Sequence, residues 1–291
     1  MHIDAVLLDA LNIPLKRKTV GSKVRELEEQ RSCSHDESSN LFIVVPVLNE
    51  APNLKRLMAS FRQLVAEFGE QHRLQFILVN DGSTDGTETV AGQLADGLDL
   101  VILSHPTNMG PGYAFGTAFE YMAPRLRATD WVVTMEGDNT SRHELLRQML
   151  IRTQEGYEVV LASPYMYGGG IVQTTAWRIF LSHIANTFIK EFLGIHGILT
   201  MSSFYRLHRG EVITKLQMLY GPRIIERQGF ESMIEMLLKM LYLQTKISEV
   251  PMLLDTSRRI GKSKMKILRT VVGYLGLWKS KRRWQEASSE V

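Results

Sequence analysis

Short apolar runs alternate with segments of helical periodicity from residue 41 onward, and this alternation limits the folds that the chain can adopt. The runs are LFIVVPV, QFILVN, DLVILS, WVVTM and YEVVLAS, in that order along the sequence. A strand that is apolar on both sides is typical of a sheet covered on both faces. The pattern therefore predicts an α/β fold, with a mostly parallel sheet and helices on both faces.

The sequence outside this alternating part has a different composition. Residues 16–40 are polar and nearly free of large apolar side chains, so we expect residues 1–40 to form a partly flexible arm. The alternating part occupies residues 41–257 and is expected to be one domain. Residues 258–291 start with the basic segment RRIGKSK, and we expect a flexible loop followed by an amphipathic C-terminal helix.

Overall composition excludes several classes of protein. A net charge of +3 in 291 residues is too small to indicate nucleic acid as the partner. The single cysteine, Cys33, excludes an internal disulfide framework and suits a reducing cytoplasm. No stretch approaches the roughly 20 uninterrupted apolar residues of a membrane-spanning helix, and the first residues do not resemble a secretory signal. We expect a cytoplasmic protein, soluble or peripheral on a membrane.

Acidic residues follow the ends of the predicted strands. Glu50 follows the first strand, Asp81 the second, and Glu136 and Asp138 the fourth. Ligands of parallel α/β sheets bind at the carboxyl ends of the strands, so these acids are expected to share one edge. Like charges that close together repel, and each would raise the pKa of the others unless a cation compensates them.

Glu136 and Asp138 are the strongest candidates for holding such a cation. Strand alternation predicts that both point to the same side, and Gly137 between them would let a ligand approach the backbone. Magnesium commonly takes one or two protein carboxylates and completes its shell with water and phosphate oxygens. A helix-capping turn formed by residues 139–141, with both acids facing water, explains the same residues equally well.

Several motifs occur in an order that resembles a known enzyme family. They are VVPVLNE, ILVNDGSTDGT, NMGPGYAFGTAFEYM, MEGD, YMYGGG, SSFYRLHRGEV, GFESMIEML and RRIGKSK. Over roughly residues 41–278 the chain resembles family 2 glycosyltransferases of the GT-A fold. Within that family it is most similar to the dolichol-phosphate mannose synthase and polyprenyl-phosphate glycosyltransferase branch.

The resemblance implies a set of residues for the donor nucleotide sugar. Pro46 and Glu50 would lie near the ribose and base, and Asp81 at the edge of the base. Gly110 would also belong to the nucleotide-sugar site. Glu136 and Asp138 would replace the paired aspartates of the family, next to the diphosphate and an Mg²⁺ or Mn²⁺ ion.

The resemblance also implies residues that hold an acceptor phosphate. Arg178 and Ser182 match an arginine and a serine that grip this phosphate in the family, and Arg178 counts among the expected catalytic residues together with Asp138. A further family arginine is replaced here by Pro164. Other cations would have to compensate for that loss, and the candidates are Arg206, Arg258, Arg259 and Lys264.

The resemblance leads to one expected activity and two alternatives. We expect inverting transfer of a hexose from GDP-mannose or a UDP-hexose to a polyprenyl or dolichyl phosphate at the cytoplasmic membrane face. A soluble enzyme that glycosylates a hydroxyl of a glycan or glycolipid is the first alternative, and Glu231 would then be the general base. A catalytically silent nucleotide-binding module is the second.

Two segments bear on a membrane partner. In WRIFLSHIANTFIKEFLGIHGIL, large apolar residues repeat at helical spacing, so the helix could lie in a bilayer interface. Packing on the sheet, or on another copy of the chain, explains this pattern as well. The C-terminal segment joins basic residues to Tyr and Trp, which indicates either anionic lipid headgroups or a solvated terminal helix.

Overall fold

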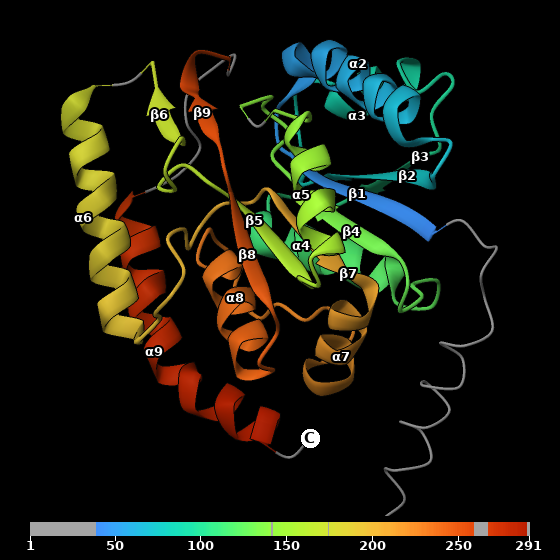
Figure 1. The fold of residues 1–291 in the computed structure, drawn as a ribbon. Coiled ribbons are helices and arrows are strands. Elements are labelled where there is room, and N and C mark those ends of the chain that lie inside the picture. The colour runs from blue at the N-terminus through green and yellow to red at the C-terminus, as the bar shows by residue number, and fades with distance from the viewer. Residues whose placement is uncertain (1–38, 141, 174, 259–266, 290–291) are drawn as a thin grey trace, which may run out of the picture. The chain divides into compact units, whose positions relative to one another are not determined.

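Apolar runs in the sequence become the central strands of a seven-stranded sheet (Figure 1). The computed structural model describes residues 39–140, 142–173, 175–258 and 267–289. Its strand order is β3-β2-β1-β4-β7-β5-β8. The strands are β1 (Ser39–Val47), β2 (His72–Asn80), β3 (Leu100–Ser104), β4 (Trp131–Thr134), β5 (Val159–Ser163), β7 (Arg206–Arg209) and β8 (Ile247–Pro251).

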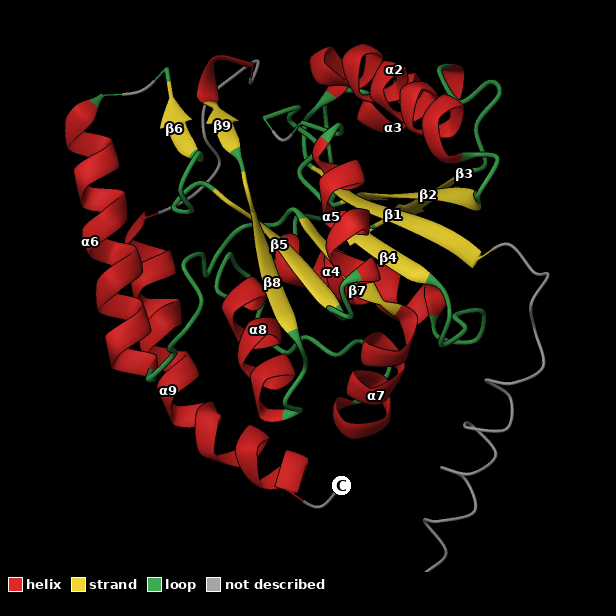
Figure 2. Cartoon of the chain, viewed as in Figure 1, coloured by secondary structure: helices red, strands yellow, loops and turns green. Residues whose placement is uncertain are grey.

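Most neighbouring strands run parallel, as predicted. β1 pairs in parallel with both β2 and β4, and the register places Val47 opposite Asn80. β7 is the exception, because it runs antiparallel to β4 and β5 on either side. A second sheet of two strands, β6 (Gly170–Val172) and β9 (Leu253–Asp255), extends beyond the carboxyl ends of β5 and β8 (Figure 2).

Helices cover both faces of the sheet and bury two apolar clusters, which confirms the predicted layers. One face carries α2 (Ala51–Phe68), α3 (Thr87–Gln93) and α5 (Leu145–Gln154). The other carries α4 (Pro111–Met122), α7 (Gly210–Tyr220), α8 (Ser232–Tyr242) and α9 (Ile267–Ser289). The apolar face of α2 forms as predicted, with Leu54, Leu57 and Phe61 buried.

The C-terminal helix α9 packs on the core through buried side chains. Trp284 is only 1% exposed, and its indole Nε1 donates a hydrogen bond to Glu226 at 3.0 Å. The buried Lys239 ammonium lies 4.9 Å from the Trp284 ring and 2.6 Å from Glu235. Residues from Ser39 onward form one compact unit that includes this helix.

Helix α6 (Ala176–Leu193) lies beside α9 at the margin of the sheet (Figure 1). Among its described side chains, those that join the core are Ile189 and Leu193 near its end. None of the helices in the described part of the chain combines the length and apolar character that crossing a membrane requires. The predicted N-terminal arm up to residue 38, together with Arg259 and Lys264 of the basic loop, lies outside the described residues.

Candidate functional site

Acidic residues gather at the carboxyl ends of β1, β2 and β4, as the sequence predicted. These three strands are neighbours and run parallel, so their ends meet at one edge of the sheet. Glu50 and Asp81 are buried there, while Glu136 is only half-buried. An edge that carries several carboxylates favours a ligand that is a cation or that has N–H groups to donate.

Glu50 is held in place directly after β1. Its backbone N–H donates to the Thr87 hydroxyl at 2.9 Å, and its carboxylate accepts a hydrogen bond from the side-chain amide of Asn53. Pro46 lies one position before the end of β1 and is half-buried opposite Val79. Both residues therefore lie at the edge where the sequence placed the ribose and base.

Asp81 fastens the loop that follows β3. Its carboxylate accepts hydrogen bonds from the backbone N–H groups of Met109 and Gly110, each at 2.8 Å. Gly110 has φ +95°, and a Cβ at this position would lie 2.4 Å from the Gln228 carbonyl oxygen. Gly110 is therefore required for backbone packing, and its N–H holds the loop against Asp81.

Glu136 and Asp138 differ in their surroundings because β4 ends before them. The strand stops at Thr134, so strand alternation does not fix the direction of either side chain. Asp138 is 9% exposed and accepts hydrogen bonds from the Thr140 N–H at 3.1 Å and the Thr140 hydroxyl at 2.6 Å. Helix α5 has Glu144 as its N-cap residue and begins without a side-chain capping hydrogen bond, so the capping turn of the alternative interpretation does not form among the described residues.

Gly137 has a different role from the predicted one. A Cβ there would lie 2.7 Å from Val47 Cγ1 and 3.1 Å from the Pro46 carbonyl oxygen. The close approach that requires glycine is therefore to strand β1, whereas the sequence suggested an approach to a ligand. This contact fixes the acidic turn against the end of the neighbouring strand.

Arg206 does not fit the prediction that it holds an acceptor phosphate. It is fully buried in β7, and its guanidinium donates hydrogen bonds to the carbonyls of Ser203, Met201 and Met233 at 2.7–2.8 Å. Burial lowers the pKa of Arg206 to about 9, against the opposing effect of Glu136 and Glu249, so it stays charged at neutral pH. Arg206 supplies a buried positive charge behind Glu136.

Ser182, one of the predicted acceptor residues on α6, lies close to a tyrosine that sequence reasoning missed. The Ser182 hydroxyl is 2.7 Å from the Tyr165 hydroxyl, and the Tyr165 ring packs edge-on against His183. Arg178 lies in the first turn of α6, but its side chain is outside the described structure. Tyr165 directly follows Pro164 and is the first residue of the YMYGGG motif, which was the available signal.

Glu231 lies at the start of α8 and faces α9. Its carboxylate accepts a long hydrogen bond of 3.3 Å from the Gly229 N–H, and a Cβ on Gly273 would lie 2.7 Å from its carboxyl carbon. Burial, helped by the negative charge of Glu231 and by Tyr165, raises the pKa of Tyr274 to about 12. Glu231 and Tyr165 therefore both lie near Tyr274, among the residues that the sequence predicted for an acceptor.

Arg258 ends the short 3-10 helix η1 (Thr256–Arg258), which follows β9. Its guanidinium pairs with Asp255 at 3.6 Å, and its carbonyl accepts a hydrogen bond from Arg56 of α2. The Arg258 guanidinium therefore lies beyond the carboxyl edge of the sheet. A role toward an acceptor remains a prediction.

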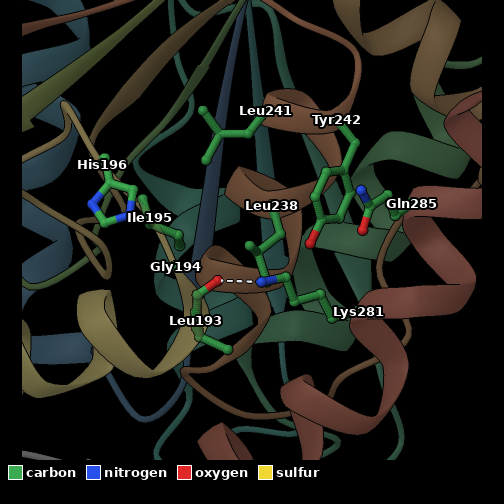
Figure 3. Close-up of a pocket in the computed structure, with 9 residues that line it drawn as sticks. All are labelled: Leu193, Gly194, Ile195, His196, Leu238, Leu241, Tyr242, Lys281 and Gln285. Atoms are coloured by element: carbon green, nitrogen blue, oxygen red, sulfur yellow. Dashed lines mark hydrogen bonds between the residues drawn. The ribbon is translucent and has the colours of Figure 1, made fainter.

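A cavity of about 390 Å³ lies at the opposite end of the helices (Figure 3). It lies between the ends of α6 and α8 and the second half of α9, where Lys281 donates a hydrogen bond to the Leu193 carbonyl. Tyr242, which lines it, ends α8 just before β8 begins. The cavity is therefore separate from the acidic strand ends.

Comparison with known proteins identifies the family. A sequence model described as glycosyl transferase family 2 matches residues 42–216, more than half of this chain. The chain belongs to glycosyl transferase family 2. This family 2 glycosyltransferase is 28% identical over 226 residues to the polyprenol monophosphomannose synthase of Mycolicibacterium smegmatis, covering 77% of this chain and 80% of that protein.

Two further similarities extend the comparison. The chain is 27% identical over 159 residues to the undecaprenyl-phosphate 4-deoxy-4-formamido-L-arabinose transferase of Pseudomonas savastanoi, covering 53% of this chain and 42% of that protein. Its fold resembles glucosyl-3-phosphoglycerate synthase from Mycobacterium tuberculosis in complex with Mn²⁺, UDP and phosphoglyceric acid. That likeness has a TM-score of 0.57 at 18% identity and covers 89% of this chain and 82% of the other. The predicted GT-A fold is confirmed.

Proposed function

We propose that this glycosyltransferase transfers a hexose, with inversion, from a nucleotide sugar to a polyprenyl phosphate at the cytoplasmic face of a membrane. The observation that carries the proposal is the position of Glu136 and Asp138 directly after β4, beside the ends of β1 and β2. The names of two relatives, a polyprenol monophosphomannose synthase and an undecaprenyl-phosphate sugar transferase, support a lipid-phosphate acceptor.

Glu136 and Asp138 fit a divalent cation. Both are oxygen donors, and among the described residues no group of three or more His, Cys, Asp or Glu could hold a metal. This chain would then supply two carboxylates and leave the other positions to water and the diphosphate, as Mg²⁺ prefers. When bound, Mg²⁺ or Mn²⁺ supplies Lewis-acid stabilisation of the charge that develops on the departing diphosphate.

A phosphate acceptor explains why the acceptor side needs cations and hydrogen-bond donors more than a base. A phosphate oxygen is already an anion near neutral pH, so its attack requires no strong general base. Arg178 and the Ser182 hydroxyl are the groups proposed to hold it. The position of Ser182 beside Tyr165 supports this assignment, because a hydroxyl pair offers a donor to a phosphate.

Product analysis tests the proposed reaction. The purified chain is incubated with radiolabelled UDP- and GDP-hexoses, Mg²⁺ or Mn²⁺, and undecaprenyl or dolichyl phosphate, and the lipid is extracted into an organic phase. Label in the organic phase that depends on the lipid phosphate is the expected result. Water-soluble glycosylated product would instead support a hydroxyl acceptor, and nucleotide binding without turnover would support a silent binding module.

Replacing Glu231 by glutamine is expected to change kcat less than about threefold, because a phosphate acceptor needs no proton removed. Loss of a general base costs about 10²- to 10⁴-fold, so the two acceptor classes differ clearly in this test. The measurement is steady-state turnover at saturating donor and acceptor. A loss of two orders of magnitude, with unchanged thermal stability, would favour attack by a hydroxyl with Glu231 as its base.

Helix α6 supports a membrane partner through its exposed apolar side chains. Trp177 and Phe188 are each 64% exposed, and Phe180 and Ile184 are about half exposed. Trp278 of α9 adds a fifth exposed apolar side chain, and the centre of its ring lies 6.3 Å from that of Phe192 on α6. A group of exposed apolar side chains on one helix is typical of a docking surface. Because the proposed acceptor is a lipid, we propose that a bilayer occupies this surface.

The double change Phe180→Ser and Phe188→Ser is expected to weaken binding to anionic phosphatidylglycerol vesicles at least tenfold. Burying one phenylalanine contributes about 1.5–3 kcal/mol, so two should exceed one order of magnitude. Vesicle co-sedimentation measures the effect. The matched control is Ile151→Ser on α5, which removes a half-exposed apolar side chain from another surface and should leave binding unchanged.

Wild-type protein that does not co-sediment with the vesicles would contradict the membrane proposal. So would a stable dimer, detected by light scattering, in which the α6 substitutions yield a monomer.

A further inference from the structure

Four cations were predicted to compensate for the arginine that Pro164 replaces, and their positions in the structure differ. Arg206 is buried, and three backbone carbonyls occupy its guanidinium. Arg259 and Lys264 lie outside the described residues. Arg258 lies in the turn η1 and is partly exposed. The surroundings of η1 therefore show which other cations lie near the one described candidate that ligands can reach.

The turn η1 is tied to two parts of the molecule. The guanidinium of Arg56, on α2, donates a hydrogen bond to the Arg258 carbonyl at 3.0 Å. On the other side, the Thr256 hydroxyl donates to the Gln173 carbonyl at 2.7 Å, directly after β6. Helix α2 begins directly after Glu50 at the acidic edge, and β6 leads along the chain to α6 (Figure 1). The turn therefore connects the acidic edge of the sheet with the strand that precedes the predicted acceptor residues.

Three arginines from separate segments come together near this turn. Arg56 belongs to α2, Arg258 ends η1, and Arg142 follows the acidic turn after β4. The Ser257 hydroxyl and N–H, together with the charges of Arg258 and Arg142, lower the pKa of Asp255. Arg142 is therefore close enough to act on the same carboxylate that pairs with Arg258 at 3.6 Å. We call Arg56, Arg142 and Arg258 the arginine cluster.

The arginine cluster carries more positive than negative charge. Asp255 pairs with Arg258, but within the described part of the chain no carboxylate lies within ion-pair distance of Arg56 or Arg142. Both of these arginine side chains are exposed. A guanidinium has five N–H donors, and the contact with the Arg258 carbonyl uses only one side of Arg56. The cluster therefore has donors and positive charge to offer to an anion.

We infer that Arg56 and Arg142 bind the phosphate group of the acceptor together with Arg258. This inference rests on the proposed function and adds two binding residues that the sequence did not indicate. A guanidinium presents two parallel N–H groups that match two oxygens of one phosphate. Several guanidinium groups can therefore hold one phosphate from different sides.

The acceptor phosphate suits the arginine cluster better than the donor diphosphate does. The divalent cation proposed at Glu136 and Asp138 would neutralise the diphosphate. The acceptor phosphate has no such cation, and an arginine that would hold it is replaced by Pro164. The hydrogen bond from Thr256 also ties η1 to the segment that leads to α6, where Ser182 lies.

Steady-state kinetics with undecaprenyl phosphate in neutral detergent micelles test the inference. We expect Arg142→Gln and Arg56→Gln each to raise KM for the lipid phosphate about tenfold, because each removes a charge-assisted hydrogen bond. KM for the nucleotide sugar should stay within about twofold. The matched control is Arg62→Gln, which removes an exposed arginine of the same helix whose guanidinium donates to the Leu94 and Asp96 carbonyls. Its KM for the lipid phosphate should also stay within about twofold.

The two substrates and the bilayer separate the possible sources of the phosphate. A higher KM for the nucleotide sugar alone would assign the arginine cluster to the donor diphosphate and overturn the inference. Unchanged kinetics with weaker binding to phosphatidylglycerol vesicles would assign it to lipid headgroups and also overturn it. If the wild type transfers no sugar to undecaprenyl phosphate, both the proposed function and the inference fail. Arg142→Gln decides even if Arg56→Gln does not fold, because none of the described residues forms a hydrogen bond or an ion pair with the exposed Arg142 side chain.

Discussion

Replacing Asp138 by asparagine is expected to lower kcat at least about 10³-fold while leaving the fold intact. A change of this size corresponds to about 4 kcal/mol of transition-state stabilisation, within reach of losing a carboxylate that holds a divalent cation. Asparagine keeps a side-chain oxygen that can accept the hydrogen bonds now donated by the Thr140 N–H and hydroxyl. The loss should therefore come from the missing negative charge.

Two measurements distinguish the loss of the negative charge from a loss of the fold. Turnover should fall, and the rise in melting temperature that nucleotide and Mn²⁺ produce together in the wild type should disappear. Glu144→Gln is a matched control, because it removes an exposed negative charge six residues later in the chain. Its turnover should stay within about twofold of the wild type, as a weak surface ion pair contributes little. Metal-dependent turnover that survives in Asp138→Asn would remove Asp138 from the site.

The sequence predicted the layers of the fold because its central strands are buried on both faces. Residues 41–47 and 159–163 form strands that lie almost entirely in the core, and their β-branched runs reflect this burial. The same reasoning placed Glu50, Asp81, Glu136 and Asp138 at one edge. Parallel strands and strand order were enough to bring these acids together.

Strand β7 could not be predicted from apolar patterning. Its sequence, RLHR, is polar and only four residues long, yet it fills the centre of the sheet between β4 and β5. His208 within it is fully buried, and burial together with the charge of Arg206 lowers its pKa to about 3. Three backbone carbonyls accept hydrogen bonds from Arg206, and Nδ1 of His208 lies 3.1 Å from the Val132 carbonyl of β4, a contact between strands that a local pattern does not record.

The acidic turn and the loop over Asp81 show the same limit at the site. The sequence placed Glu136 and Asp138 by strand alternation, but β4 ends at Thr134 and the direction of each side chain depends on a turn. His105 follows β3 with no motif that marks it, and only the folded loop brings it to Asp81. Tertiary contacts therefore decided what each acid can bind.

Replacing Arg206 by methionine is expected to lower the free energy of unfolding by about 3–5 kcal/mol, the usual effect of removing one partner from a buried charge network. Methionine has a similar length but no donors, so three carbonyls lose their hydrogen bonds. Glu249, which accepts hydrogen bonds from the Leu199 and Thr200 N–H groups, would also lose its buried counter-charge.

Urea unfolding followed by tryptophan fluorescence measures the change in stability, provided that the slope m stays constant. Arg209→Met is the matched control, because it removes a partly exposed arginine from the same strand, where the ion pair with Glu211 is 3.9 Å long. That variant should lose about 1 kcal/mol or less. Arg206→Lys should recover only part of the stability, since an ammonium does not reproduce the planar fork that reaches three carbonyls. A loss below 1 kcal/mol in Arg206→Met would mean that the buried charge behind Glu136 stabilises neither β7 nor the acidic turn.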